Sequence, residues 1–254
     1  VAVLTAGDAM GVTLTDIQAT TVAAVNGAYG AAGDNTNNAI ALLVYDKKTS
    51  TAEDDSVTFS FTSSAVDAGD ATTDFVVTQL TANFIENFTF SLGHGAGDDE
   101  DASITTFTAN AAESLTILGD VDFTLTAPAT VTSVSAGSMT GELDITFSAE
   151  DVSVTGGSGD DTFTFGASLN TDDSVIGGAG DDTLEATFGA AVYDDDIEAD
   201  VETLAITQAA GANAVTLDLR DVETLELITM AADATEGTTT TFDNAGTAFA
   251  RLTL

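Results

Sequence analysis

The residues with the clearest chemical potential are two nine-residue segments that combine glycine and aspartate in the same order. Residues 156–164 read GGSGDDTFT and residues 177–185 read GGAGDDTLE. Both fit the pattern GGxGxDxUx, in which U is apolar, and they start 21 residues apart. Between them, Asp173 precedes Val175 by two positions and so resembles the second half of a further copy.

This combination of residues suits a hard cation. Glycine adopts φ values that side chains forbid, so a glycine-rich turn can aim its carbonyl oxygens at one point, and aspartate adds charge. Calcium takes about six to eight oxygens, which one short turn cannot supply, so we expect turns of successive coils to share an ion. We place one ion between residues 156–161 and 177–182, with Asp161 and Asp182 as carboxylate ligands. The predicted metal site comprises Gly156, Gly157, Gly159, Asp161, Asp173, Gly177, Gly178, Gly180 and Asp182.

The alternative for these segments is an ordinary pair of Gly-Asp turns. A weaker echo, residues 93–101, lacks the apolar residue two places after the aspartate, so we interpret it as an isolated acidic loop. It contains the only histidine, His94, which we expect to be solvated. Phe163, Val175 and Leu184 are predicted to point into the core.

The charge balance favours a cation as partner. The chain has 4 basic and 42 acidic residues, a formal net charge of -38. Such a surface repels phosphate backbones and anionic lipids, which argues against nucleic acid as a partner. Self-repulsion strains the compact state, and salt or divalent cations relieve it. The alternative is that the acidity only keeps an abundant protein soluble in saline surroundings.

Other compositional features exclude several classes of protein. There is no cysteine, so disulfides and thiolate metal sites are ruled out. The longest apolar stretch, 39–45, is too short for a transmembrane segment, and no signal segment opens the chain. Because both ends lie in strand-like runs, we expect a fragment or a processed product.

Two regions are expected along the chain. In residues 1–81 the apolar spacing predicts a helix at about 16–26, then strands at 39–45 and 57–61 that form a hairpin, and a third strand at 75–80. From residue 82 to 254, short apolar alternations recur about every eight to twelve residues between Gly, Asp, Asn and Ser turns. This pattern indicates β structure.

A second motif recurs in the β region. It reads IENF at 85–88, AESL at 112–115, and VETL at both 201–204 and 222–225, and the last two copies lie 21 residues apart. A period near 20 residues is typical of a solenoid, because one coil cannot bury its apolar face until the next stacks on it. The alternative is a β-sandwich whose strands begin alike.

The two complete nonapeptides resemble the repeat-in-toxin (RTX) family, whose repeats form calcium-binding parallel β-rolls in bacterial proteins exported by type I secretion. With residues 112–120, 134–141 and 154–156, the resemblance widens to RTX-bearing S-layer proteins over roughly 110–230. It implies a mainly β, right-handed parallel β-solenoid or β-roll. It also implies a secreted, cell-surface structural protein that folds and self-assembles when it binds Ca2+. Only two complete repeats and no C-terminal secretion signal are present, so the export route is inferred.

Enzymatic activity is disfavoured. General acid and base catalysis uses His, Lys or a perturbed carboxylate, and with one His and two Lys no triad can be assembled. The main rival function is an RTX adhesin or fibre spacer module. A polysaccharide-acting β-helical enzyme and a viral structural protein are further alternatives. The expected partners are further copies of the chain, in a lattice or fibre, and a cell-surface glycan.

Overall fold

Nearly every described residue lies in a β-strand or in a short turn between strands. The computed structural model describes residues 2–6, 11–14, 21–27, 39–45, 55–63, 75–93, 101–149, 151–188, 192–193, 198–209, 215–219, 222–223, 225–231, 240–243 and 251–253. Within these ranges there is no helix, and therefore none that could cross a membrane.

The strands form two long sheets and a small one. Sheet A is 10-stranded, in the order β1 (Ala2–Ala6), β3 (Thr21–Gly27), β5 (Ser56–Ser63), β7 (Asn87–Gly93), β10 (Ser114–Gly119), β12 (Ser133–Met139), β14 (Ser153–Thr155), β16 (Ser174–Ile176), β19 (Glu198–Asp200) and β22 (Val222–Glu223). Sheet B is 12-stranded, in the order β2 (Gly11–Leu14), β4 (Ala39–Tyr45), β6 (Phe75–Asn83), β8 (Asp101–Ile104), β11 (Asp122–Thr126), β13 (Leu143–Thr146), β15 (Thr162–Gly166), β17 (Thr183–Phe188), β20 (Thr203–Gln208), β23 (Leu227–Ala231) and β25 (Arg251–Thr253), with β9 (Phe107–Thr108) beside β6. Sheet C is 3-stranded, with β18 (Val192–Tyr193), β21 (Val215–Asp218) and β24 (Thr240–Asp243).

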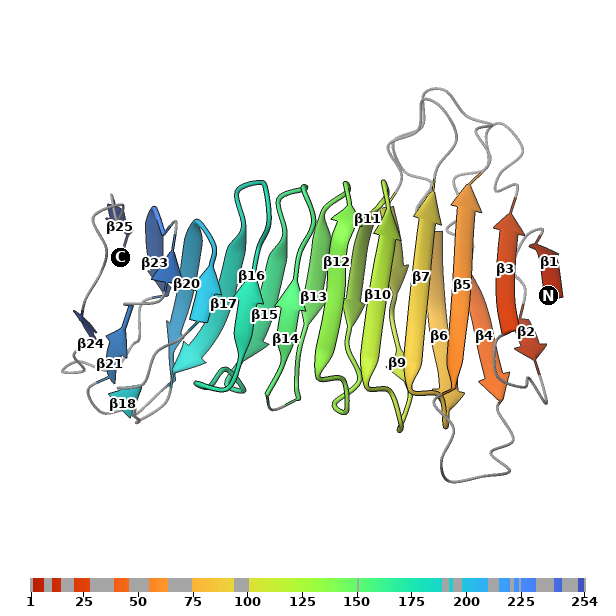
Figure 1. Ribbon diagram of the computed structural model, residues 1–254, viewed down its shortest axis with the longest axis horizontal. Coiled ribbons are helices and arrows are strands. Elements are labelled where there is room, and N and C mark those ends of the chain that lie inside the picture. The colour runs from red at the N-terminus through yellow and green to blue at the C-terminus, as the bar shows by residue number, and fades with distance from the viewer. Residues whose placement is uncertain are drawn as a thin grey trace.

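The chain moves back and forth between sheets A and B and adds one strand to each as it advances. The pairs β10–β12 in sheet A and β11–β13 in sheet B are both parallel, and so are the other pairs of the described strands. Figure 1 shows the coils stacked along one long axis. The protein is therefore a parallel β-solenoid, which confirms the predicted fold class at that level.

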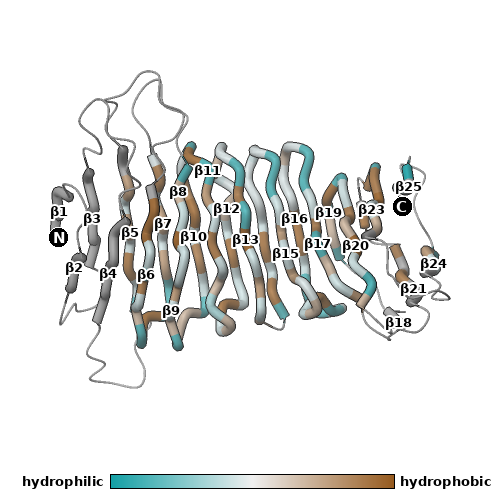
Figure 2. The backbone as a smooth tube through the Cα atoms, turned by 180° about the vertical axis from the view of Figure 1, so that it is seen from behind, coloured by the Kyte–Doolittle hydropathy of each residue, from teal (hydrophilic) through white to brown (hydrophobic). Residues whose placement is uncertain are grey.

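The core lies between the two long sheets. Strand residues alternate between buried and more exposed, as in β7 and β15, because successive side chains of a strand point to opposite faces. Figure 2 shows apolar residues recurring along the strands while the most hydrophilic ones gather at the turns. Parallel stacking also places aromatic rings beside each other: the ring centroid of Phe90 lies 5.7 Å from that of Phe59 and 5.6 Å from that of Phe123.

Two predictions for the N-terminal region are wrong. Residues 21–26 of the expected helix lie in β3, which pairs with β5 over its whole length, and residues 16–20 lie outside the described residues. The sequence TVAAVNG is compatible with a helix or a strand. It forms a strand here because each of its seven residues pairs with a residue of β5. The expected hairpin is absent because β4 belongs to sheet B and β5 to sheet A.

The strands predicted at 39–45, 57–61 and 75–80 are confirmed, although each of the last two extends beyond the expected bounds. Strand pairing continues across the expected division between residues 81 and 82. In sheet A, β5 pairs with β7, and in sheet B, β4 pairs with β6, which pairs with β8. The N-terminal strands therefore belong to the same solenoid as the Gly-Asp turns.

Candidate metal-binding turns

The two Gly-Asp turns lie on top of each other in successive coils. Residues 156–161 connect β14 to β15, and residues 177–182 make the same connection from β16 to β17. The N–H of Gly156 donates to the carbonyl of Ile176 at 2.7 Å, and the N–H of Ala179 donates to the carbonyl of Gly157 at 3.1 Å. The 21-residue spacing is therefore the length of one coil, as expected for turns that could share an ion.

Two glycines of the second turn are required by its geometry. Gly178 has φ 120° and Gly180 has φ 137°, in the region that L side chains rarely adopt. A Cβ atom on Gly178 would overlap the carbonyl oxygen of Gly157, and one on Gly180 would overlap that of Gly159. Glycine at these positions thus lets the backbones of the two turns approach closely.

The aspartates that end the turns are buried and linked to each other. Asp161 is 0% exposed and Asp182 1% exposed. Oδ1 of Asp182 accepts the N–H of Asp161 at 2.8 Å. Oδ1 of Asp161 accepts the N–H of Leu143 at 2.8 Å, while its Oδ2 accepts the N–H of Gly157 at 2.6 Å. One carboxylate oxygen of Asp161 thus contacts the preceding coil, and the other faces the glycines of its own turn.

A third carboxylate, that of Glu202, continues this arrangement, and the sequence patterns did not predict it. The N–H of Asp182 donates to Oε2 of Glu202 at 2.8 Å. We call Asp161, Asp182 and Glu202 the carboxylate ladder. The register places Thr162 beside Thr183 and Thr183 beside Thr203, so DDTF, DDTL and VETL occupy one structural position. Aligning the VETL motif of residues 201–204 with the nonapeptides would have revealed Glu202.

The second VETL copy, residues 222–225, does not continue the ladder. Val222 and Glu223 form β22 in sheet A, whereas Thr203 and Leu204 begin β20 in sheet B. The residue that follows Glu202 in register is Glu226, whose N–H donates to the carbonyl of Glu202 at 2.8 Å. The interpretation of the 21-residue spacing between these two copies as one repeat is therefore wrong.

The ladder brings negative charges close together, with Asp161 and Asp182 buried and Glu202 partly buried. Burial raises the pKa of Asp182 to about 6, and the carboxylates of Asp161 and Glu202 add to the increase. Burial also raises the pKa of Asp161, against the lowering effect of its hydrogen bonds from Gly157 and Leu143. The charged neighbours that shift these two pKa values are all acidic. A bound cation would relieve this repulsion.

The third predicted aspartate, Asp173, is not part of this group. It ends the connection from β15 to β16, at the opposite edge of the solenoid from Asp161 and Asp182. It is 2% exposed, and its Oδ1 accepts the N–H of Val152 at 2.6 Å while Oδ2 accepts that of Asn170 at 2.7 Å. Asp173 thus secures a corner of the other edge.

The remaining ligands of a calcium ion would have to be carbonyl oxygens. Among the side chains that the structure describes, no three His, Cys, Asp or Glu residues gather as a metal-holding group. The stacked turns contain two buried aspartates, whose oxygens accept backbone N–H groups in this structure, and glycine carbonyls. Carboxylate and carbonyl oxygens are the kind of donor that calcium takes. The weaker echo lies largely outside the described residues, since 94–100 are among those not described.

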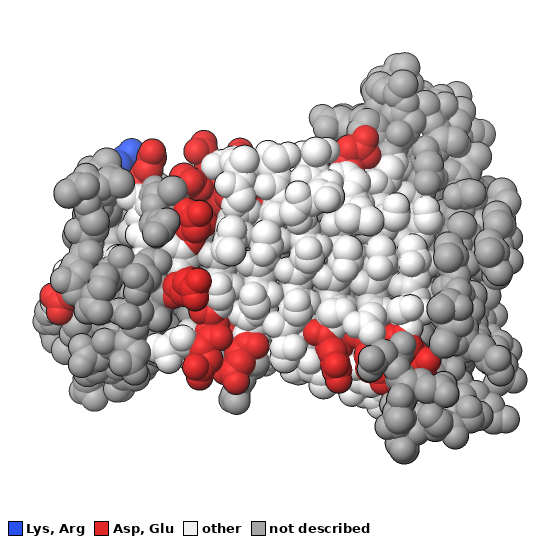
Figure 3. All heavy atoms as spheres, in the orientation of Figure 1, with Lys and Arg blue, Asp and Glu red and all other residues white. Residues whose placement is uncertain are grey.

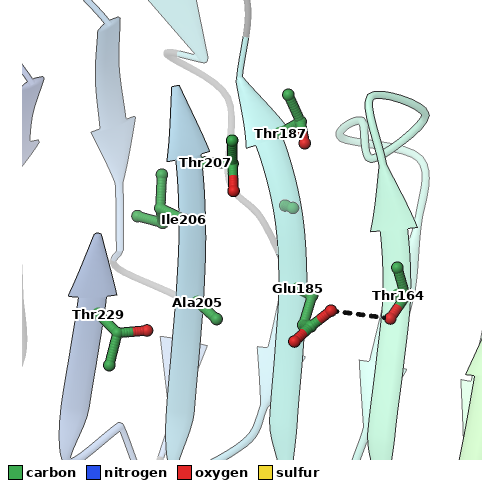
Figure 4. A pocket seen from close by; sticks show the side chains of 8 residues that line it. Thr164, Glu185, Thr187, Ala205, Ile206, Thr207 and Thr229 are labelled. Atoms are coloured by element: carbon green, nitrogen blue, oxygen red, sulfur yellow. Dashed lines mark hydrogen bonds between the residues drawn. The ribbon is translucent and has the colours of Figure 1, made fainter. Parts of the chain in front are cut away.

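A shallow hollow lies on the outer face of sheet B. It is lined by Thr164, Glu185, Ala186, Thr187, Ala205, Ile206, Thr207 and Thr229. Figure 4 shows Glu185 turned toward Thr164, whose Oγ1 donates to Oε2 of Glu185 at 3.1 Å. The lining of the hollow holds one carboxylate, that of Glu185, among hydroxyl and methyl groups.

The fold and the turns together define a parallel β-solenoid with stacked Gly-Asp corners. No protein-family model, curated protein or solved structure matches the chain. Its function is therefore argued from the geometry of these corners and from the distribution of charge.

Proposed function

We propose that this protein is an extracellular calcium-binding structural protein, a subunit of a bacterial S-layer that folds and assembles when it binds calcium. The observation that carries the proposal is the pair Asp161 and Asp182. Their carboxylates are buried, lie one coil apart in stacked glycine turns, and have only acidic groups among the charges that shift their pKa values.

Calcium fits this pair for electrostatic reasons. A buried carboxylate is costly unless it is neutralised, and a divalent cation between two coils neutralises both at once. An ion that binds only the folded chain stabilises that state by its binding free energy. With a net charge of -38, folding should therefore depend on calcium where it is plentiful, outside the cell, and be suppressed where it is scarce.

The elongated shape supports a structural role. The coils stack along one axis. The second candidate is an adhesin or fibre spacer, because a solenoid of stacked coils also makes a stiff rod. A lattice subunit should form sheets when calcium is added, whereas a spacer should stiffen and remain monomeric.

The test is a calcium titration of the chelated chain, followed by circular dichroism and light scattering, with Asp161→Ala, Asp182→Ala and the control Asp181→Ala. Asp181 is exposed and adjacent to Asp182. We expect β signal and scattering to appear with calcium, and the first two variants to shift the midpoint to higher calcium by at least tenfold. A chelated chain that is already folded and indifferent to calcium would contradict the proposal.

A further inference from the structure

A large part of one face of the solenoid, the outer side of sheet A, is free of charge. The strands β5, β7, β10, β12, β14 and β16 contain no charged residue. We call their outward side chains the hydroxyl face, because serine and threonine predominate there. One row runs across the strands in register as Thr58, Thr89, Thr116, Ser135, Thr155 and Ile176.

The absence of charge is specific to this face. On sheet B, strands at the same level carry Asp101, Asp122, Asp144 and Glu185 among their outward residues. On sheet A itself, charge returns only at β19, with Glu198 and Asp200. Figure 3 shows this face as a broad uncharged area with acidic groups at its edges and toward the C-terminal strands. In a chain with 42 acidic residues, such segregation marks a surface with its own role.

The chemistry of the hydroxyl face limits the kinds of partner that can bind to it. A basic partner would be drawn to the acidic edges instead, and an anionic polymer would find no positive charge here. A membrane or a hydrophobic peptide needs a large apolar patch. Among the described residues of this face, the one exposed large hydrophobic side chain is that of Ile176, at 43%. The fitting partner is a neutral, flat surface with small hydroxyl groups.

We propose that the hydroxyl face docks against the same face of a second copy of this chain. Two copies that each carry a net charge of -38 repel each other, and this face lets them meet without bringing carboxylates together. Small side chains permit face-to-face packing of sheets at about 10 Å. A two-fold axis would bring the same face of both copies together, as in an isologous interface. The inference rests on the proposed structural function, and it names the surface through which copies join.

The test places one new charge on either face of the calcium-loaded full chain. Ser135→Glu adds a carboxylate to the middle of the hydroxyl face, and Thr146→Glu adds the same charge to an exposed position of sheet B. By sedimentation velocity over a range of concentrations, we expect Ser135→Glu to raise the dissociation constant of self-association at least tenfold. Thr146→Glu should change it less than twofold. Equal effects of the two variants would overturn the inference.

Cross-linking locates the contact independently. The chain has no cysteine, so Ser135→Cys introduces a single thiol. β12 lies near the middle of the six strands, so a two-fold axis through the centre of the hydroxyl face would bring the two thiols close together. We expect oxidation to cross-link Ser135→Cys and not Thr146→Cys. Equal cross-linking of both would overturn the inference.

Calcium binding, measured on the same samples, separates this inference from the proposed function. A wild-type chain that binds calcium and stays monomeric overturns the docking of copies and favours the adhesin or spacer over the S-layer subunit, while calcium binding itself stands. If that monomer pellets with an insoluble polysaccharide and Ser135→Glu does not, the face binds a glycan instead. A chain that binds no calcium overturns the proposed function. In that case, the effect of Ser135→Glu on self-association still shows whether copies join through the hydroxyl face.

Discussion

The backbone N–H of Asp161 donates a hydrogen bond of 2.8 Å to Oδ1 of Asp182, the equivalent residue one coil later. Asp182 and Glu202 are related in the same way. At corners that lead into sheet A, Oδ1 of Asp173 accepts the N–H of Val152. An acidic side chain therefore secures the corner of the preceding coil at several places along the solenoid. In the proposed account, Asp161 and Asp182 have a second role as calcium ligands.

The ladder predicts a specific role for Glu202. Glu202→Ala should lower the free energy of unfolding by about 1–3 kcal/mol, because the N–H of Asp182 loses its acceptor in a buried place. Glu202→Gln retains an amide oxygen and should lose clearly less. Urea denaturation in excess calcium measures both. Equal losses in the two variants would show that charge, and not the hydrogen bond, is what Glu202 contributes.

The pKa of Asp182 predicts a pH dependence of the calcium-free fold. Because this pKa is raised from 3.8 to about 6, the folded chain binds the proton more tightly than the unfolded chain. The resulting stability is complete below about pH 4 and is lost as the pH rises through 6. Circular dichroism of the chelated chain between pH 7 and pH 4 measures it, as a rise in β signal when the pH falls.

The matched control for this prediction is Asp182→Asn, which is neutral at every pH. It should lack this part of the pH dependence and be more stable than wild type at pH 7 in chelator. Identical pH profiles for the two chains would contradict the assignment. With calcium present, stability should instead fall as the pH is lowered, because protons compete with the ion for the carboxylate. The affinity for calcium should therefore decrease below about pH 6.

The close stacking of the turns predicts a large effect at Gly180. Gly180→Ala places a side chain at φ 137° and against the carbonyl of Gly159, so we expect a loss of roughly 2–4 kcal/mol in unfolding free energy. The control is Gly137→Ala in β12, where a Cβ atom would have only ordinary contacts at 3.9 Å. Its effect should remain within about 0.5 kcal/mol. Similar unfolding midpoints for both variants would rule out the stacked geometry.

The aromatic core predicts which substitutions in the N-terminal half lower the free energy of unfolding most. Phe90 is 0% exposed and packs on rings from neighbouring coils, so Phe90→Ala should cost about 3–5 kcal/mol. Phe84, at 39% exposure, serves as the control of the same residue type, and Phe84→Ala should cost less than about 1 kcal/mol. Comparable losses at the two positions would contradict the placement of the core between the sheets.

Patterns repeated from coil to coil could be predicted from the sequence. The Gly-Asp turns at 156–161 and 177–182 stack as expected, and Phe163, Val175 and Leu184 are buried at 0%, 1% and 0% exposure. These predictions succeeded because each coil repeats the same requirement: glycine where backbones approach, and an apolar residue two places after the aspartate.

Features that depend on pairing between coils could not be predicted from local patterns. Residues 21–27 have a helical apolar spacing, yet they form β3 because β5 offers a partner for every residue. Glu202 was missed because glutamate replaces aspartate where the glycines of the turn are lost.

The most direct test of the calcium proposal is a calorimetric titration of the chelated chain with calcium at constant ionic strength, in wild type, Asp182→Asn and Asp181→Asn. We predict saturable binding to wild type and to Asp181→Asn, and an affinity at least tenfold weaker for the site in Asp182→Asn. Binding of equal affinity in all three chains, or none in any of them, would contradict calcium coordination by the stacked turns.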